Sequence, residues 1–169
     1  MIVGVERLMK FLPILTLLIA LTGHAGTLEG RIIGISDGDT VTLLDTENTQ
    51  HKIRLAGIDA PEKMQAFGMR SKESLSNLIF GKSVRIETGK IDRYGRTIGK
   101  ILINDTDANL EQVKLGMAWH YKAYQREQSQ QDRFDYAEAE SEARDAKRGL
   151  WKDADAIPPW EFRKPSSKH

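Results

Sequence analysis

The chain has 169 residues, 40% of them hydrophobic, which suits one domain with a single core. It contains no cysteine, so disulfide bonds cannot stabilise it and its stability should not depend on redox conditions. With 25 basic and 24 acidic residues the net charge is only +1. A dedicated polyanion binder usually has a clear excess of basic residues, so any polyanion-binding site in this chain must come from a local group of residues.

Residues 1–25 have the layout of a signal peptide. Arg7 and Lys10 precede an apolar run, Phe11–Leu21, and small residues follow up to Ala25. The run is 11 residues long, whereas a membrane-spanning helix needs about 20 apolar residues, so an uncleaved anchor is the lesser alternative. We expect cleavage after Ala25 and a secreted or periplasmic protein, in which basic and acidic side chains are equal in number.

Three β-rich runs come first in the remaining chain, at Leu28–Ser36, Thr40–Asp45 and His51–Ala56. The turn-forming residues Asp37-Gly38-Asp39 separate the first two, and the polar stretch Thr46–Gln50 separates the second from the third. This pattern predicts an antiparallel meander.

A helix and two more strands follow. The apolar spacing predicts a helix over Gly68–Phe80, with Gly81 at its C-terminal stop. Two further β runs, Ser83–Thr88 and Thr97–Ile103, are joined by Gly89–Arg96, which carries the polar and glycine residues of a tight connection.

The last third of the chain predicts two more helices. The first covers Ala108–Leu115, and the second runs from Ser129, its candidate N-cap, to Arg148. Phe134 is expected to pack on the long helix together with its alanines.

The C-terminal residues 153–169 are expected to add an extended segment, Ile157–Trp160, which docks through aromatic side chains. A short polar basic tail, Arg163–His169, follows it, and the main domain covers residues 26–152.

These elements indicate a mainly β protein with helices (α+β). Five antiparallel strands with a helix between the third and the fourth predict a five-stranded OB-type Greek-key barrel with three α-helices. Such barrels often bind oligonucleotides, but a fold alone does not give a function.

Three segments carry the functional information: Ile35–Thr40 (ISDGDT), Arg54–Glu62 (RLAGIDAPE) and Asp92–Arg96 (DRYGR). Asp-Gly-Asp alone is typical of a hairpin turn, but the three segments in this order are far more specific than any one of them. Together they resemble the staphylococcal nuclease (thermonuclease) family, and the resemblance covers roughly Leu28 to Trp151.

The resemblance implies a calcium site. Two strand ends, carrying Asp39 and Asp59, can bring hard carboxylate oxygens together and leave room for water ligands, which suits Ca²⁺. By resemblance both aspartates ligate the metal, with the backbone carbonyl of Ala60 as a further ligand. The best-known member has threonine at that place, so the metal affinity could be weaker here.

The resemblance also implies the catalytic residues. Glu62 would orient or deprotonate the attacking water, and Arg54 and Arg96 would hold the scissile phosphate, because planar guanidinium groups can grip its oxygens in pairs. Taken alone, the glutamate reads as an exposed loop residue and the arginines as surface charges.

Substrate-binding residues are expected among the aromatic side chains. Tyr94 and Tyr124 match the tyrosines that line the family's nucleotide pocket better than Tyr121 does, and Lys122 stands where a second pocket tyrosine would be expected. The histidines at 51, 120 and 169 lack ligand spacing, which argues against zinc.

The function that the resemblance implies is a secreted, calcium-dependent endo- and exonuclease. It would cleave the bond to the 5′ oxygen in DNA and RNA, single-stranded or locally opened, and leave 3′-phosphate ends. It would act as a monomer without a stable protein partner. Two alternatives stay open: a non-catalytic OB-type module that binds single strands, and a domain in which calcium is only structural.

Overall fold

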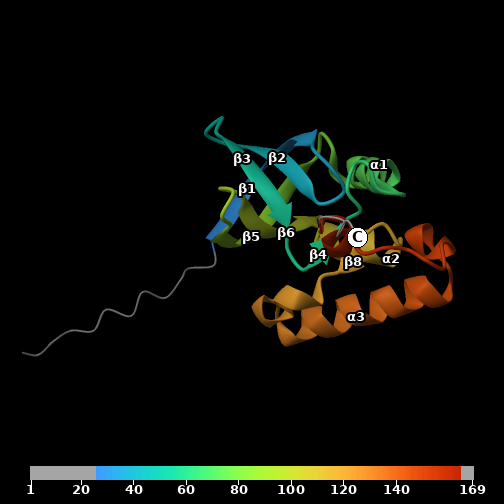
Figure 1. Ribbon diagram of the computed structural model, residues 1–169. Helices are drawn as coiled ribbons and strands as arrows, with labels where there is room; N and C mark the ends of the chain where they lie inside the picture. The colour runs from blue at the N-terminus through green and yellow to red at the C-terminus, as the bar shows by residue number, and fades with distance from the viewer. Residues whose placement is uncertain (1–25, 165–169) are drawn as a thin grey trace, which may run out of the picture.

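The computed structural model describes residues 26–164. The expected signal peptide and the last five residues of the expected basic tail lie outside the described residues. The five main strands are β1 (Gly26–Ile35), β2 (Thr40–Asp45), β3 (Gln50–Leu55), β5 (Ser83–Ile91) and β6 (Thr97–Ile103). They form one sheet in the order β3-β2-β1-β5-β6, which closes into a barrel because β3 also pairs with β6 (Figure 1).

The barrel is the predicted OB-type α+β fold, but one strand pair differs from the prediction. The closing pair β3–β6 is parallel, with Ile53 opposite Thr97 and Leu55 opposite Gly99. Five antiparallel strands cannot form a closed ring, because strand directions cannot alternate fully around an odd number of strands. The expectation of five antiparallel strands was therefore wrong at this pair.

Three two-residue strands were not predicted, and two of them position the functional site. β4 (Ile58–Asp59) pairs antiparallel with β8 (Trp119–His120) in a small separate sheet. β7 (Thr106–Asp107) pairs with the end of β6. Runs this short carry no periodicity that a sequence pattern could reveal.

The three predicted helices are present as α1 (Gly68–Ile79), α2 (Ala108–Lys114) and α3 (Gln130–Asp145). In Figure 1, α1 lies beside the barrel and α3 runs below it. Gly81, at a φ of 73°, follows the end of α1 as predicted, and the Ser129 side chain caps α3 by accepting a hydrogen bond from the backbone of Asp132.

Helix α3 ends at Asp145, three residues before the predicted end at Arg148. Lys147 takes a left-handed φ of 49°, and the N–H of Arg148 donates to the carbonyl of Ala143 at 2.8 Å. This bond is typical of a Schellman ending, which usually has glycine at the left-handed position. Because the nearest glycine is Gly149, the sequence pattern placed the end too late.

The C-terminal segment was expected to be extended, but part of it is helical. Besides the 3₁₀ helices η1 (Lys122–Glu127) and η2 (Gly149–Lys152), a fourth short helix, α4, covers Pro159–Phe162. Proline at the first helical position explains this difference, because its fixed φ suits a helix start and its missing N–H would have no partner there.

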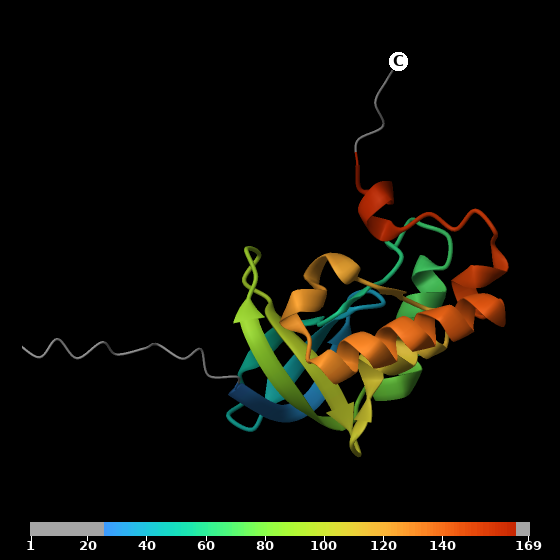
Figure 2. The same cartoon turned by 90° about the horizontal axis from the view of Figure 1, so that it is seen from below.

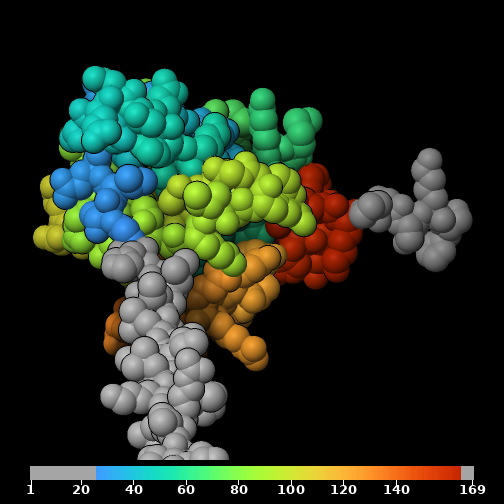
Figure 3. Space-filling view, turned by 90° about the vertical axis from the view of Figure 1, so that its left-hand side faces the viewer, coloured from blue at the N-terminus to red at the C-terminus, as the bar shows by residue number. Residues whose placement is uncertain are grey.

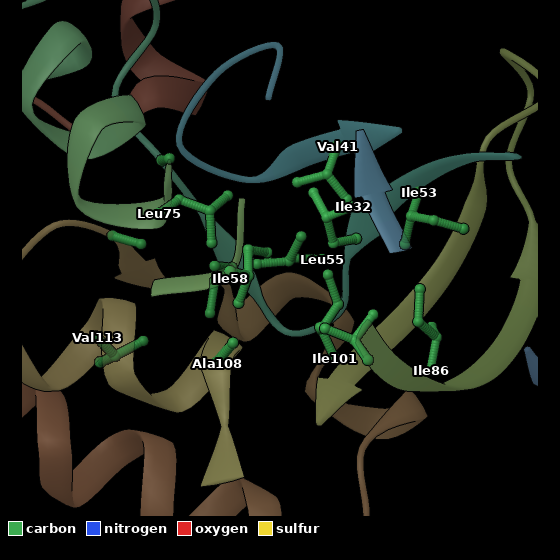
Figure 4. Packing of buried hydrophobic residues seen from close by; sticks show 14 of the residues in the cluster. Ile32, Val41, Ile53, Leu55, Ile58, Leu75, Ile86, Ile101, Ala108 and Val113 are labelled. Carbon is green, nitrogen blue, oxygen red and sulfur yellow. The ribbon is translucent and has the colours of Figure 1, made fainter. Parts of the chain in front are cut away.

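The main core fills the barrel and continues to the helices below it (Figure 4). Tyr136 is the buried aromatic side chain of α3, whereas Phe134, which was expected to pack, is 63% exposed. The main core contains Ile32, Val41, Leu43, Ile53, Leu55, Ile58, Ala60, Leu75, Ile79, Val84, Ile86, Ile101, Ala108, Val113, Ala118, Tyr136 and Ala139.

A second, aromatic cluster packs the C-terminal segment onto β8. The ring centres of Trp119 and Trp151 are 4.3 Å apart, and Trp160 lies 5.6 Å from Trp119. Trp160 also stacks on Tyr121, with ring centres 5.3 Å apart and an 18° angle between the planes. These contacts hold α4 beside the loop that follows β4 (Figure 2). Among residues 26–164, no helix has the length and apolar character needed to cross a membrane.

Candidate active site

A cleft of about 1190 Å³ opens between the barrel and the segments that follow it. Figure 3 shows the face on which the yellow-green β5–β6 hairpin, the orange η1 region and the red C-terminal segment meet. The predicted site residues that line the cleft are Asp39, Arg54, Asp59, Ala60, Glu62, Tyr94, Arg96 and Tyr124. Of the predicted set, Lys122 does not line it.

The turn between β1 and β2 places the first carboxylate. The backbone N–H of Asp39 donates to Oδ1 of Asp37 at 3.1 Å, which shapes the turn. A side chain at Gly38 would lie 1.8 Å from Oγ of Ser71 and 2.7 Å from Cβ of Ala60, so only glycine fits there. The turn is therefore pressed against α1 and the loop after β4, and the buried Asp39 side chain meets that loop.

The second carboxylate is joined to the first through Arg54. Nη1 of Arg54 lies 2.9 Å from Oδ2 of Asp39, and Nη2 lies 2.8 Å from Oδ1 of Asp59. Oδ2 of Asp39 also accepts the backbone N–H of Ala60 at 2.6 Å. Ile53 and Leu55 point into the core, so the strand alternation turns Arg54 to the cleft, as the sequence predicts.

Burial disfavours the ionised form of the Asp39 side chain. Desolvation raises the pKa of the Asp39 carboxyl to about 7, although Arg54 acts in the opposite direction and lowers it. A cation placed against this carboxylate would stabilise its ionised form. The electrostatics of the site therefore favour an additional positive charge near Asp39 and Asp59.

Glu62 lies at the open side of the same site. Its backbone N–H donates to Oε1 of Gln65 at 3.1 Å, which fixes the loop after Pro61. The Glu62 side chain is 39% exposed, so it can reach water in the cleft. Glu62 lies near Asp59, because the guanidinium group of Arg163 contacts both side chains.

Arg163 completes the site and was not predicted as part of it. Its Nη2 lies 2.7 Å from Oδ2 of Asp59, and its Nη1 lies 3.2 Å from Oδ1 of Asp59 and 2.7 Å from Oε1 of Glu62. These hydrogen bonds raise the pKa of Arg163 further above its usual value. From the sequence, Arg163 was expected to lie in a short polar basic tail. The nearest hint to its position is Trp160, three residues earlier, which docks the segment.

Arg96 lines the cleft but is not part of the carboxylate cluster. Its Nε and Nη2 bind Oδ2 of Asp92, at 2.8 and 2.7 Å, and its guanidinium lies 5.3 Å from the Tyr94 ring centre. Arg93 packs against the same ring at 4.8 Å. The hairpin thus presents two arginines and an exposed aromatic ring to the cleft, although the sequence analysis singled out only one of these arginines.

Tyr94 and Tyr124 line the cleft as expected, but Tyr121 and Lys122 are placed differently from the sequence expectation. Tyr121 lines the cleft as well as Tyr94 and Tyr124, and burial together with the charge of Asp59 raises the pKa of Tyr121. Lys122 instead pairs with Glu140 on α3, where Nζ and Oε2 are 2.9 Å apart. Tyr121 therefore lines the cleft beside Tyr124, in the role that the sequence analysis gave to position 122.

The donor set fits one hard cation. Within residues 26–164, no group of three or more histidine, cysteine, aspartate or glutamate side chains could hold a metal ion. Asp39 and Asp59 nevertheless offer carboxylate oxygens from separate strand ends, and both already face guanidinium groups in this arrangement. Two carboxylates, with carbonyl and water oxygens as further ligands, match the preferences of calcium.

Comparisons with known proteins show which proteins this chain is similar to. A family model described as "Staphylococcal nuclease homologue" matches residues 52–153. A protein of Haemophilus influenzae named an uncharacterized endonuclease is 42% identical over 157 residues, which cover 93% of this chain and 84% of that protein. A micrococcal nuclease of Shigella flexneri is 38% identical over 147 residues, or 82% of each chain.

Proposed function

Because the chain belongs to the staphylococcal nuclease family and is a nuclease that hydrolyses phosphodiester bonds, we propose that it cleaves DNA and RNA in this cleft with the help of calcium. One observation carries the proposal: Asp39 and Asp59, both buried and on separate strand ends, face one shared guanidinium, that of Arg54. Buried carboxylates gathered in this way need positive charge, which a divalent cation supplies.

Asp39, Asp59 and the carbonyl of Ala60 would hold the calcium ion. The carbonyl role is compatible with alanine, because a backbone oxygen does not depend on the side chain. When bound, calcium would polarise the phosphate and offset its negative charge as the transition state forms. The family resemblance supports calcium rather than another hard cation.

Glu62 would act on the attacking water. A carboxylate at the open side of the site can accept a proton from water as the oxygen attacks phosphorus, in line with the bond that breaks. The 5′ oxygen leaves and takes up a proton from solvent, so the products carry a 3′-phosphate and a 5′-hydroxyl. No covalent intermediate with the protein is needed.

Arg54 and Arg96 would hold the phosphate from two sides of the cleft. Arg54 comes from β3 and Arg96 from the end of the β5–β6 hairpin, so the two cations reach the cleft from different elements. Guanidinium groups bind pairs of phosphate oxygens and stabilise the charge that develops on them.

Aromatic side chains would bind the nucleotides. Tyr94 and Tyr124 are well exposed at the cleft, and base stacking on such rings is tolerant of sequence. Base faces inside a duplex are covered by the neighbouring bases, so we infer that the substrate is single-stranded or locally opened. The protein would work as a monomer, secreted or periplasmic after removal of residues 1–25.

The test is digestion of a labelled DNA oligonucleotide and of the matching RNA with Ca²⁺, Mg²⁺ or EDTA. The proposal predicts cleavage of both with calcium, none with EDTA, and product ends that a 3′-phosphatase converts to 3′-hydroxyls. Asp59→Asn should abolish the calcium-dependent cleavage. Asp105→Asn, at a carboxylate 94% exposed and away from the cleft, is the matched control. Equal cleavage in EDTA, or products with 5′-phosphates, would contradict the proposal.

A further inference from the structure

The C-terminal segment reaches the site that contains Asp59 and Glu62. Trp160 stacks on Tyr121, and the carbonyl of Ile157 accepts a hydrogen bond from the Gln65 side chain. In Figure 2 the red helix α4 lies next to the green loop that carries Glu62. Arg163, directly after this helix, is thereby directed into the site.

Arg163 binds carboxylate oxygens of Asp59, the proposed metal ligand, and of Glu62, which would act on the attacking water. Oδ1 of Asp59 already accepts a hydrogen bond from Arg54, and Arg163 binds the other oxygen, Oδ2, most closely. It also binds Oε1 of Glu62 at 2.7 Å. Both oxygens of Asp59 are thus bonded to guanidinium groups, and Oε1 of Glu62 is bonded to Arg163 as well.

We propose that Arg163 is an intramolecular competitor of the divalent cation, so that the C-terminal segment closes the site until the cation displaces it. This inference rests on the proposed function, in which Asp39 and Asp59 bind calcium. Arg163 places one positive charge against Asp59 and Glu62, whereas calcium would place two against Asp59 and Asp39. The two cations share Asp59, so tight binding of one weakens binding of the other.

The geometry makes this competition reversible. The Arg163 side chain is 43% exposed although its partner Asp59 is only 1% exposed, so the guanidinium can leave to solvent without opening the core. The apparent affinity for a ligand falls by the fraction of molecules that are ready to bind it. If Arg163 is docked about nine-tenths of the time, it weakens calcium binding about tenfold.

The experiment is calorimetric titration of the full chain with CaCl₂, without nucleic acid, at fixed ionic strength. Arg163→Gln removes the competing cation. Trp160→Ala retains the charge but removes the ring that docks the segment, so it separates docking from charge alone. Lys164→Gln is the matched control, because it removes an equal exposed charge at the neighbouring residue. Circular dichroism of each metal-free variant verifies its fold.

We expect Arg163→Gln and Trp160→Ala to bind calcium about tenfold more tightly than the wild type, and Lys164→Gln to stay within about twofold of it. An Arg163→Gln affinity equal to or weaker than that of the wild type overturns the inference and leaves calcium binding in place. An equal gain from Lys164→Gln also overturns it, because general charge would then explain the effect. If neither the wild type nor Arg163→Gln binds calcium, both the inference and the calcium-dependent function fail.

Discussion

Arg54 holds together two carboxylates that would otherwise repel each other. Its two terminal nitrogens lie within 2.9 Å of Asp39 and Asp59, and all three side chains are largely withdrawn from water. Removing one partner of a buried ion pair is strongly destabilising, because it leaves an uncompensated charge. Arg54 therefore has a structural role in addition to the phosphate-binding role proposed for it.

His120 gives the protein a defined response to acid. It is 2% exposed, and its Nε2 lies 2.9 Å from Oε1 of Gln128, whereas Nδ1 has no hydrogen-bond partner among the described residues. Burial lowers the pKa of His120 below its usual value of 6.5. The unfolded chain therefore binds a proton at residue 120 in a pH range where the folded protein does not, and the contribution of His120 to the free energy of unfolding should fall as the pH drops below 6.5.

Urea unfolding between pH 7.5 and pH 5 measures this effect. His120→Gln, which cannot titrate, should lose less stability over this range than the wild type. His51→Gln is the matched control, because His51 is partly exposed and pairs with Asp45 at 2.6 Å. An equal pH dependence in His120→Gln and the wild type would show that His120 does not carry it.

The sequence motifs located the buried carboxylates but not every side chain around them. Asp39 and Asp59 lie within two of the three sequence motifs, so the motifs alone pointed to them. Tyr121 and Lys122 are neighbours, so which of them faces the cleft depends on the pairing of β8 with β4, which is too short to show in a pattern. Arg163 is directed by the docking of Trp160, a tertiary contact with β8 and Tyr121.

At the scale of elements, the turn between β1 and β2 couples the barrel to helix α1. Gly38→Ala would place a methyl group 1.8 Å from Oγ of Ser71 and 2.7 Å from Cβ of Ala60. The turn must then move, and overpacking of this kind costs about 1–3 kcal/mol. Because the same turn carries Asp39, calcium affinity should fall together with stability, as measured by urea unfolding and by calorimetric titration.

Gly34→Ala is the control for this prediction. Gly34 lies in β1, and a methyl group there would meet Oγ1 of Thr42 at an ordinary 3.4 Å. Its effect on unfolding should stay within about 1 kcal/mol, and calcium affinity should not change. Equal effects from the two substitutions would mean that the tight contact at Gly38 is not what fixes the turn.

Element boundaries show where local patterns stop being informative. The start of α3 was predictable, because Ser129 and Asp132 form a local cap. Its end was not, since Lys147 adopts a conformation that sequence rules assign to glycine. The prediction that Phe134 packs on the inward face of α3 was wrong. Tyr136 is the inward aromatic residue instead, and its hydroxyl donates a 2.8 Å hydrogen bond to Asp107, the N-cap of α2.

At the scale of the whole molecule, the barrel has an apolar interior of its own. The barrel closes through β3–β6 pairing, and its interior is filled by aliphatic side chains from β1, β2, β3, β5 and β6. We therefore expect the protein to remain folded at 25 °C in EDTA. Calcium at 100 times its dissociation constant should add about 2.7 kcal/mol, seen as a higher Tm by circular dichroism.

Loss of the folded circular dichroism spectrum in EDTA at 25 °C would instead support a purely structural calcium ion.

The barrel itself was predictable from the order of strands and helices, since five β runs with a helix after the third suit few other folds. Its parallel closure follows from the odd strand number once a closed barrel is assumed.

The most direct measurement is the cleavage rate of Glu62→Gln on a single-stranded DNA oligonucleotide at saturating calcium, with calcium binding measured on the same sample. If Glu62 takes the proton of the attacking water, the rate should fall about 10²–10⁴-fold. Calcium affinity should be no weaker than in the wild type, because the substitution also loosens Arg163 from the site. A Glu62→Gln enzyme with the full wild-type rate would contradict the account.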